Sequence, residues 1–183
     1  MLHEMTAAHL RNAYGGESMA HMRYAIWGTL AERDNFPNVA RLFRAISHAE
    51  LVHASNHFSV HRNLSGAFIA NSGGIFGSGT TSKNLQGGID GETFEIEEMY
   101  PVYLNVAQFQ NEKGAELSFH YALSAEKIHA AMFRKAKQAV DEGRDVVVAQ
   151  VGICENCGHT VEGQPPDECP ICNAGKERYK IFG

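Results

Sequence analysis

Four short acidic segments constrain this chain more than any other feature, because each lies near the middle of a stretch with helical periodicity. They contain Glu17, Glu50 with His53, Glu92 with Glu95, and Glu126 with His129. Residues three apart in a helix lie on one face, one turn from each other. Two Glu-x-x-His pairs, with carboxylates from two further helices, are how a four-helix bundle holds two metal ions. Buried together without cations, these carboxylates would be costly, so the pattern predicts a dinuclear metal site.

The composition is that of a globular protein. The chain has 183 residues, of which 44% are hydrophobic, and its net charge of −5 gives no basic surface for nucleic acid. The sequence lacks a run of about 18 apolar residues, so we expect no membrane span. The first residues do not resemble a signal peptide. We therefore expect a cytoplasmic protein whose cysteines stay reduced.

Apolar periodicity predicts four long helices, over residues 2–33, 37–63, 80–111 and 112–142. Pro37 suits the first turn of the second helix, and Gly143 suits the position just past the end of the fourth. Gly87, Gly88 and Pro101 weaken the third helix, so tertiary contacts or metal ligation must hold it.

The second and third predicted helices are joined by residues 65–82, which are rich in Gly, Ser and Thr. Such a segment is either a linker between separate domains or a crossover along a bundle. We favour the crossover, because the helices on both sides of it must contribute to one metal site. Ferritin-like bundles have one such long connection.

The composition changes near residue 145. Residues 146–149 read Val-Val-Val-Ala, which predicts a short strand. Two Cys-x-x-Cys pairs then predict a tetrahedral metal site made by Cys154, Cys157, Cys169 and Cys172. A zinc ribbon is one alternative, but redox-active iron fits better because a di-iron site that turns over needs electrons. We predict a di-iron four-helix bundle over residues 1–145 and a small metal-binding domain over residues 146–183.

Together these residues resemble the rubrerythrin family over nearly the whole chain. Residues 79–101, with Gly91-Glu92-Thr93-Phe94-Glu95 at their centre, are similar to the family's third-helix signature. Residues 154–182 look like its short rubredoxin module. The resemblance implies a mainly α fold: a ferritin-like four-helix bundle with one long crossover, plus a small β-rich rubredoxin-like domain. It implies a di-iron centre and one iron bound by four cysteines, with zinc as a substitute.

The resemblance also implies a reaction, the reduction of hydrogen peroxide to water in protection against oxidative stress. The implied ligands of the di-iron centre are Glu17, Glu50, His53, Glu92, Glu95, Glu126 and His129. Glu95 separates this family from storage-type ferritins, and in the family one iron moves between this glutamate and the histidine at position 53. Tyr24 and Tyr100 match family tyrosines that form hydrogen bonds near the site. His21, His57 and His61 keep no assigned role: each could be a ligand, a donor to a ligand or a surface residue.

The implied partners are hydrogen peroxide and an external electron donor, such as an NAD(P)H-dependent reductase, a rubredoxin or a ferredoxin. The sequence has no GxGxxG-type nucleotide site of its own. In the family the donor module serves the di-iron site of a head-to-tail partner, which implies a homodimer. Whether subunits exchange helices stays open. Two rival functions also stay open: a ferroxidase, storage or oxidase protein of the ferritin-like class, and a non-catalytic electron carrier or zinc-stabilised binding module.

Overall fold

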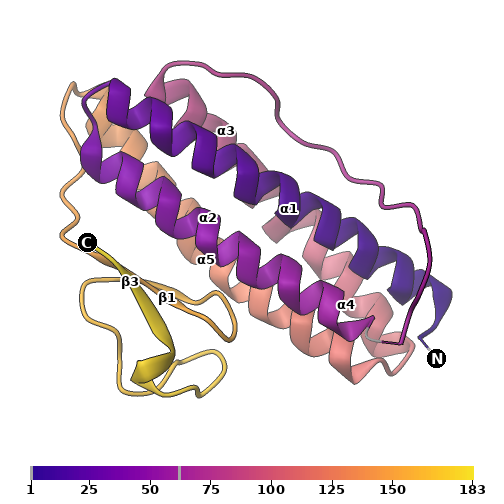
Figure 1. The fold of residues 1–183 in the computed structure, drawn as a ribbon. Helices are drawn as coiled ribbons and strands as arrows, with labels where there is room; N and C mark the ends of the chain where they lie inside the picture. Colours follow the sequence, from indigo (N-terminus) through magenta and orange to yellow (C-terminus); the bar gives the residue numbers. More distant parts are fainter. Residues whose placement is uncertain (1, 62) are drawn as a thin grey trace.

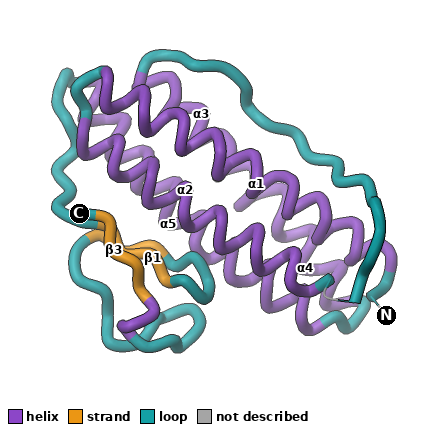
Figure 2. Tube along the Cα trace, viewed as in Figure 1, coloured by secondary structure: helices purple, strands orange, loops and turns teal. Residues whose placement is uncertain are grey.

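A computed structural model of the chain describes residues 2–61 and 63–183. A four-helix bundle carries a small antiparallel sheet against one side (Figures 1 and 2). The helices are α1 (Glu4–Arg33), α2 (Pro37–Val60), a third helix in the three parts α3 (Thr81–Phe94), η1 (Glu95–Met99) and α4 (Tyr100–Phe109), and α5 (Lys113–Asp141). The predicted fold class is confirmed. The second helix ends at Val60 rather than at residue 63, and residue 62 of the predicted range lies outside the described residues.

The third helix is held by close contacts with its neighbours. A Cβ atom added to Gly87 would lie 2.9 Å from Cη2 of Trp27, and one added to Gly88 would lie 3.0 Å from Cδ2 of Phe133. The two glycines therefore allow α3 to approach α1 and α5 more closely than any side chain would permit. This close packing offsets the low helix propensity that the sequence indicates.

The proline of this helix follows a π-helical turn. Pro101 lacks a backbone N–H and cannot continue the regular hydrogen-bond ladder. The wider turn η1 comes directly before Tyr100 and Pro101, and it begins at Glu95. Turns of this kind change the direction of the side chains that follow them and occur often at functional sites. Here both Glu92, before the turn, and Tyr100, after it, are buried.

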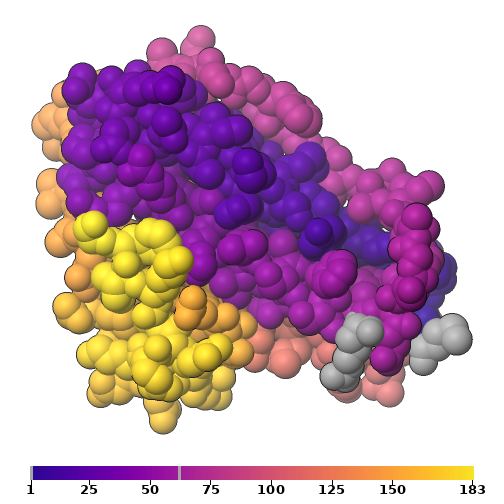
Figure 3. Space-filling view, in the orientation of Figure 1, coloured from indigo at the N-terminus to yellow at the C-terminus, as the bar shows by residue number. Residues whose placement is uncertain are grey.

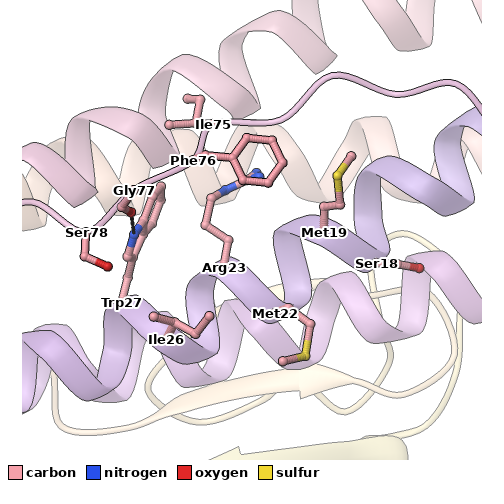
Figure 4. Close-up of a pocket in the computed structure, with 10 residues that line it drawn as sticks. All are labelled: Ser18, Met19, Met22, Arg23, Ile26, Trp27, Ile75, Phe76, Gly77 and Ser78. Carbon is pink, nitrogen blue, oxygen red and sulfur yellow. Dashed lines mark hydrogen bonds between the residues drawn. The ribbon is translucent and has the colours of Figure 1, made fainter.

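The glycine-rich connection is a crossover, as predicted. It runs beside α1 from the end of α2 to the start of α3 (Figure 1), and its described residues form neither helix nor strand before Thr81. The indole Nε1–H of Trp27 donates a hydrogen bond of 3.0 Å to the carbonyl oxygen of Gly77 (Figure 4). This contact fastens the crossover to α1.

The C-terminal part of the chain, residues 146–183, is called the tail below. Its strands are β1 (Val151–Cys154), β2 (Thr160–Glu162) and β3 (Tyr179–Phe182), in the order β2-β1-β3, with a short helix η2 (Lys176–Arg178) before the last strand. In the space-filling view the tail lies directly against α2 (Figure 3). Among the described residues, no helix has the length and apolar character that a membrane span requires.

The strand predicted over residues 146–149 is wrong, because these residues form no strand. Val146 and Val148 are buried against the core of the bundle, while Val147 between them is 80% exposed. Their carbonyl oxygens accept hydrogen bonds from the side chains of Asn38 (2.9 Å) and Arg41 (2.8 Å) of α2. The β-branched residues alternate as in a strand, but side chains of a helix replace the partner strand.

The bundle core consists of two apolar clusters with a polar layer between them. On α1, Glu17 lies between Ala13 of one cluster and Ala20 of the other. On α5, Glu126 follows Ala122 of one cluster and precedes Phe133 of the other. The apolar layers separate the polar layer from water at both ends of the bundle, which strengthens electrostatic interactions within it.

Candidate metal centre

Six of the seven predicted bundle ligands meet in the polar layer. They are Glu17 from α1, Glu50 and His53 from α2, Glu92 from α3, and Glu126 and His129 from α5. Each is at most 1% exposed. Their ligand atoms form two groups, each within 4.8 Å: Glu17, Glu50, His53 and Glu126, and Glu50, Glu92, Glu126 and His129. Glu50 and Glu126 belong to both groups, which is the position of carboxylates that bridge two metal ions.

Both imidazoles point the same ring nitrogen at the carboxylates. Nδ1 of His53 lies 2.9 Å from Glu50 Oε2 and 2.9 Å from Glu126 Oε1. Nδ1 of His129 lies 2.6 Å from Glu126 Oε2 and 3.2 Å from Glu50 Oε1. His53 therefore contributes its Nδ1 to the first group, and His129 contributes its Nδ1 to the second. The Nε2 atom of each ring points away from the polar layer.

The electrostatics of this layer favour bound cations. Burial raises the pKa of Glu17 and of Glu92, and the nearby charges of Glu126 and Glu50 raise both further. Burial opposes a charge on His53, but the carboxylates of Glu126 and Glu50 outweigh it and raise the pKa of this imidazole. Oε2 of Glu17 and Oε2 of Glu92 are buried without a hydrogen-bond partner among the described residues. Mixed carboxylate and imidazole ligation suits iron or manganese, and two divalent ions would satisfy these oxygens.

Glu95, the seventh predicted ligand, lies apart from both groups. It is half-buried at the start of η1 and lines a cavity of about 400 Å³ between the crossover, α1 and the third helix. Burial raises the pKa of Glu95, and the charges of Glu17 and Glu92 raise it further, so this carboxylate is near enough to interact with the site. Arg23, Asn71 and Tyr103 also line the cavity. Glu95 therefore connects the polar layer with a space large enough for a small molecule.

Two buried phenols donate hydrogen bonds to the carboxylates. Oη of Tyr24 donates to Glu92 Oε1 at 2.8 Å, and Oη of Tyr100 donates to Glu17 Oε1. Burial raises the pKa of both tyrosines, and the neighbouring carboxylates raise it further, so both phenols keep their protons.

The histidines left without a role are placed differently from one another. His57 is fully buried and contacts Tyr100 and Ser118, a connection that the sequence analysis missed. The sequence did offer a signal for this histidine, because His57 lies four residues after His53 and therefore on the same helical face as that candidate ligand. Nδ1 of His21 lies 2.7 Å from the carbonyl oxygen of Ser47, and His61 is only partly buried near the end of α2.

The four cysteines come together in the tail and are free. Their sulfur atoms lie within 4.8 Å of one another, with Cys154 and Cys172 3.6 Å apart and Cys157 and Cys169 3.5 Å apart. A hydrogen bond with Cys157 lowers the pKa of Cys154 to about 5, so this thiol ionises readily. Four convergent sulfurs fit one tetrahedral iron or zinc ion.

The tail covers the outer edge of both imidazoles. Nε2 of His129 lies 2.8 Å from Oγ1 of Thr160, whose hydroxyl donates to the carbonyl oxygen of Gly158 at 3.1 Å. Gly158 has φ 81°, and a Cβ atom there would overlap the ring of His53. Since Gly158 directly follows Cys157, the two metal-binding clusters are separated by a few bonded and hydrogen-bonded atoms.

An apolar groove elsewhere on the molecule contains none of the predicted site residues. It lies between α1 and the crossover and is lined by Met19, Met22, Ile26, Trp27 and Phe76, among others (Figure 4). The chemistry of the chain is therefore inside the bundle and at the tail, not in this groove.

The fold and the two clusters define a ferritin-like carboxylate bundle with an appended rubredoxin-like domain. The rubrerythrin family matches residues 9–137, and the rubredoxin-like domain of rubrerythrins matches residues 153–180. The chain belongs to the rubrerythrin family, as the resemblance predicted. The residues present fit the predicted cofactors, a di-iron centre and one iron bound by four cysteines.

Individual relatives agree with this assignment. Rubrerythrin-2 of Clostridium acetobutylicum is 50% identical over 178 residues, which cover 97% of each chain. Rubrerythrin of Nitratidesulfovibrio vulgaris is 29% identical over 185 residues, covering 97% of this chain and 94% of the relative. A solved structure of fully reduced, all-ferrous nigerythrin has a TM-score of 0.85 at 27% identity and covers 97% of this chain and 86% of that one.

Proposed function

We propose that this chain is a peroxidase that reduces hydrogen peroxide to water at a di-iron centre and draws its electrons from the four-cysteine iron. We propose as bundle ligands Glu17, Glu50, His53, Glu92, Glu95, Glu126 and His129. The tail iron is held by Cys154, Cys157, Cys169 and Cys172. The division of the chain falls near residue 145, where Asp145 accepts hydrogen bonds from the first amides of α2 and the tail begins.

The contact between the tail and the imidazole edge carries this proposal. Thr160 touches His129, and Gly158 lies against His53, so the four-cysteine site is placed where it can exchange electrons with the bundle site. A zinc-stabilised binding module would not need this placement. Glu95 supports the peroxidase over a storage protein, because it adds a carboxylate that lines a cavity and interacts with the charges of Glu17 and Glu92.

The reaction consumes two electrons and two protons for each hydrogen peroxide and yields two water molecules. A bound ferrous pair would supply the two electrons, one from each ion. The phenols of Tyr24 and Tyr100 hold protons beside the carboxylates, and the raised pKa of each keeps those protons in place until they are needed. Glu95 and His53 would each offer a ligand for a different oxidation state of one iron.

Anaerobic stopped-flow spectroscopy of the reduced, iron-loaded protein tests the proposal. We expect rapid oxidation after mixing with hydrogen peroxide, followed by the colour of the oxidised iron–thiolate site as the tail gives up its electron. Protein with zinc at the tail should show the first phase only. A protein that reacts with dioxygen but hardly with peroxide would instead favour the oxidase or ferroxidase, and failure of the tail iron to oxidise would favour the non-catalytic alternative.

We further propose an external electron donor, a homodimer and a cytoplasmic location. An NAD(P)H-dependent reductase, a rubredoxin or a ferredoxin is the class of donor required, because the sequence lacks a GxGxxG nucleotide site.

Sedimentation of the purified protein will give the assembly state. Mixed dimers of a Cys169→Ser chain and a Glu126→Gln chain then test which bundle each tail serves: activity recovered by mixing would show transfer between head-to-tail subunits, and no recovery would show that each tail serves its own bundle.

A further inference from the structure

We propose that Ser118, His57 and Tyr100 form a proton relay that leads from Ser118 of α5 to the carboxylate of Glu17. The relay would deliver the protons of the peroxide reaction, so it rests on the function proposed above. It assigns a role to a buried histidine that contributes to neither group of metal ligands.

The relay is a continuous line of hydrogen bonds between three helices. Ser118 Oγ of α5 lies 2.8 Å from His57 Nδ1 of α2, and His57 Nε2 lies 2.9 Å from Tyr100 Oη of α4. Tyr100 then donates to Glu17 of α1. His57 and Tyr100 are 0% exposed, while Ser118 is 5% exposed. Ser118 is therefore the one member of the three with any exposed surface, and the other end of the line is at the metal-binding layer.

The partners of His57 distinguish it from a histidine with a structural role alone. A hydroxyl group can donate and accept at once, so hydroxyls on both ring nitrogens allow protons to pass through the ring. His21 shows the contrast, because among the described residues only its Nδ1 has partners, the carbonyl oxygen of Ser47 at 2.7 Å and the hydroxyl of Ser47 at 3.0 Å, so no line of hydrogen bonds passes through the ring. The other phenol at the site, Tyr24, donates to Glu92 and forms no second hydrogen bond of this kind among the described residues.

The surroundings keep the ring neutral, as a relay through two tautomers requires. Burial lowers the pKa of His57 to about 3, and His53 of the same helix and His61, just after its end, oppose its charge further. Glu126 of α5 acts in the opposite sense but does not outweigh them. The rings of Phe119 and Tyr100, with centroids 5.5 Å and 5.9 Å away, fix the plane of the imidazole.

One transfer moves one proton and no electrons. The Tyr100 hydroxyl proton passes to Glu17 as His57 gives its Nε2 proton to the phenol oxygen. At the same time Ser118 gives its hydroxyl proton to Nδ1 and takes one from water. The relay is ready again once both hydroxyls have rotated and the imidazole has returned to its first tautomer, and two such transfers match the two protons that each peroxide consumes.

Nitrogen-15 NMR of the zinc-loaded, diamagnetic protein tests the relay without turnover. We expect His57 to be neutral from pH 5 to pH 8 with its proton on Nε2, and this proton to exchange with water more slowly in a Ser118→Ala variant. An imidazole charged at pH 7, or an exchange rate that Ser118→Ala leaves unchanged, would overturn the relay whatever reaction the protein performs.

Single-turnover oxidation of the reduced protein by peroxide gives the second test. Glutamine at position 57 can keep both hydrogen bonds but cannot pass a proton, so His57→Gln should slow oxidation about 100-fold, with a solvent deuterium isotope effect on this phase at least as large as in the wild type. His21→Gln is the matched control and should react at the wild-type rate. If His57→Gln fails to fold, Ser118→Ala replaces it. Wild-type protein inert to peroxide would refute the proposed function, whereas reactive protein insensitive to both substitutions would refute the relay alone.

Discussion

Nε2 of His129 in the bundle and Oγ1 of Thr160 in the tail lie 2.8 Å apart. This hydrogen bond joins a histidine of the bundle cluster to the segment of the tail that holds the four-cysteine cluster. The hydroxyl of Thr160 donates in turn to Gly158, next to Cys157. The bond fixes which ring nitrogen of His129 carries the proton and leaves Nδ1 free for a metal.

Replacement of Thr160 by valine should weaken the contact between the two clusters. Valine has the same shape but leaves the buried Nε2–H of His129 without an acceptor, which costs about 1–3 kcal/mol. We expect a lower free energy of unfolding and slower oxidation of the tail iron after peroxide is added. Urea unfolding and stopped-flow absorbance measure the two effects. Thr160→Ser keeps the hydroxyl, and a serine variant as impaired as the valine variant would contradict the role of the hydrogen bond.

Replacement of Gly158 by alanine should move the tail away from His53. Gly158 has φ 81°, and its Cβ atom would lie 2.6 Å from Cδ2 of His53. Gly163 is the matched control, because it has φ 87° and no atom within 4 Å of its Cβ position. Both variants should lose about 1–2 kcal/mol of stability from the left-handed backbone. Only Gly158→Ala should also slow electron transfer from the tail iron, and equal transfer rates in the two variants would refute the contact.

Local spacing predicted which candidate ligands share a helical face. Glu50 and His53 are three residues apart on a regular helix, and so are Glu126 and His129, which is why helical geometry placed them correctly on one face. The same arithmetic treated Glu92 and Glu95 as equivalent. The π-helical turn that starts at Glu95 breaks this equivalence, and nothing in the local pattern apart from Pro101 indicates such a turn.

Features that depend on contacts between distant segments could not be predicted. His57 acquires its partners from α4 and α5, 43 and 61 residues away in the chain. Likewise, β-branched composition predicted a strand at Val146, but burial against α2 determines the structure there. Propensity describes a residue's own preference, whereas these positions follow the surface that the rest of the chain presents.

Replacement of Glu95 by glutamine should slow turnover while the iron stays bound. The six other bundle ligands remain in place, so iron content should be unchanged. Loss of the carboxylate beside the cavity should lower the rate of peroxide reduction by about 100-fold. Metal analysis and steady-state peroxidase assays measure the two quantities. Glu98→Gln, on the exposed side of the same π-helical turn, should behave like the wild type. Full activity in Glu95→Gln would show that this glutamate takes no part in the reaction.

Acidification should destabilise the wild-type protein more than a His57→Gln variant. The pKa of His57 is about 3 in the folded chain and 6.5 as the ordinary value, so between these limits the unfolded chain binds a proton that the folded chain does not. Stability from the neutral ring is therefore complete above pH 6.5 and falls as the pH decreases toward 3. From pH 7 to pH 5 this loss amounts to about 2 kcal/mol.

Urea unfolding of both proteins at pH 7, 6 and 5 measures this effect, and the difference between them cancels the contributions of the metal ligands they share. Glutamine does not titrate, so the wild type should lose about 2 kcal/mol more than the variant over this range. Parallel losses would mean that His57 takes up a proton in the folded state. A charged imidazole beside Tyr100 could not accept a proton from Ser118, so the same result would also argue against the direction of proton transfer toward Glu17.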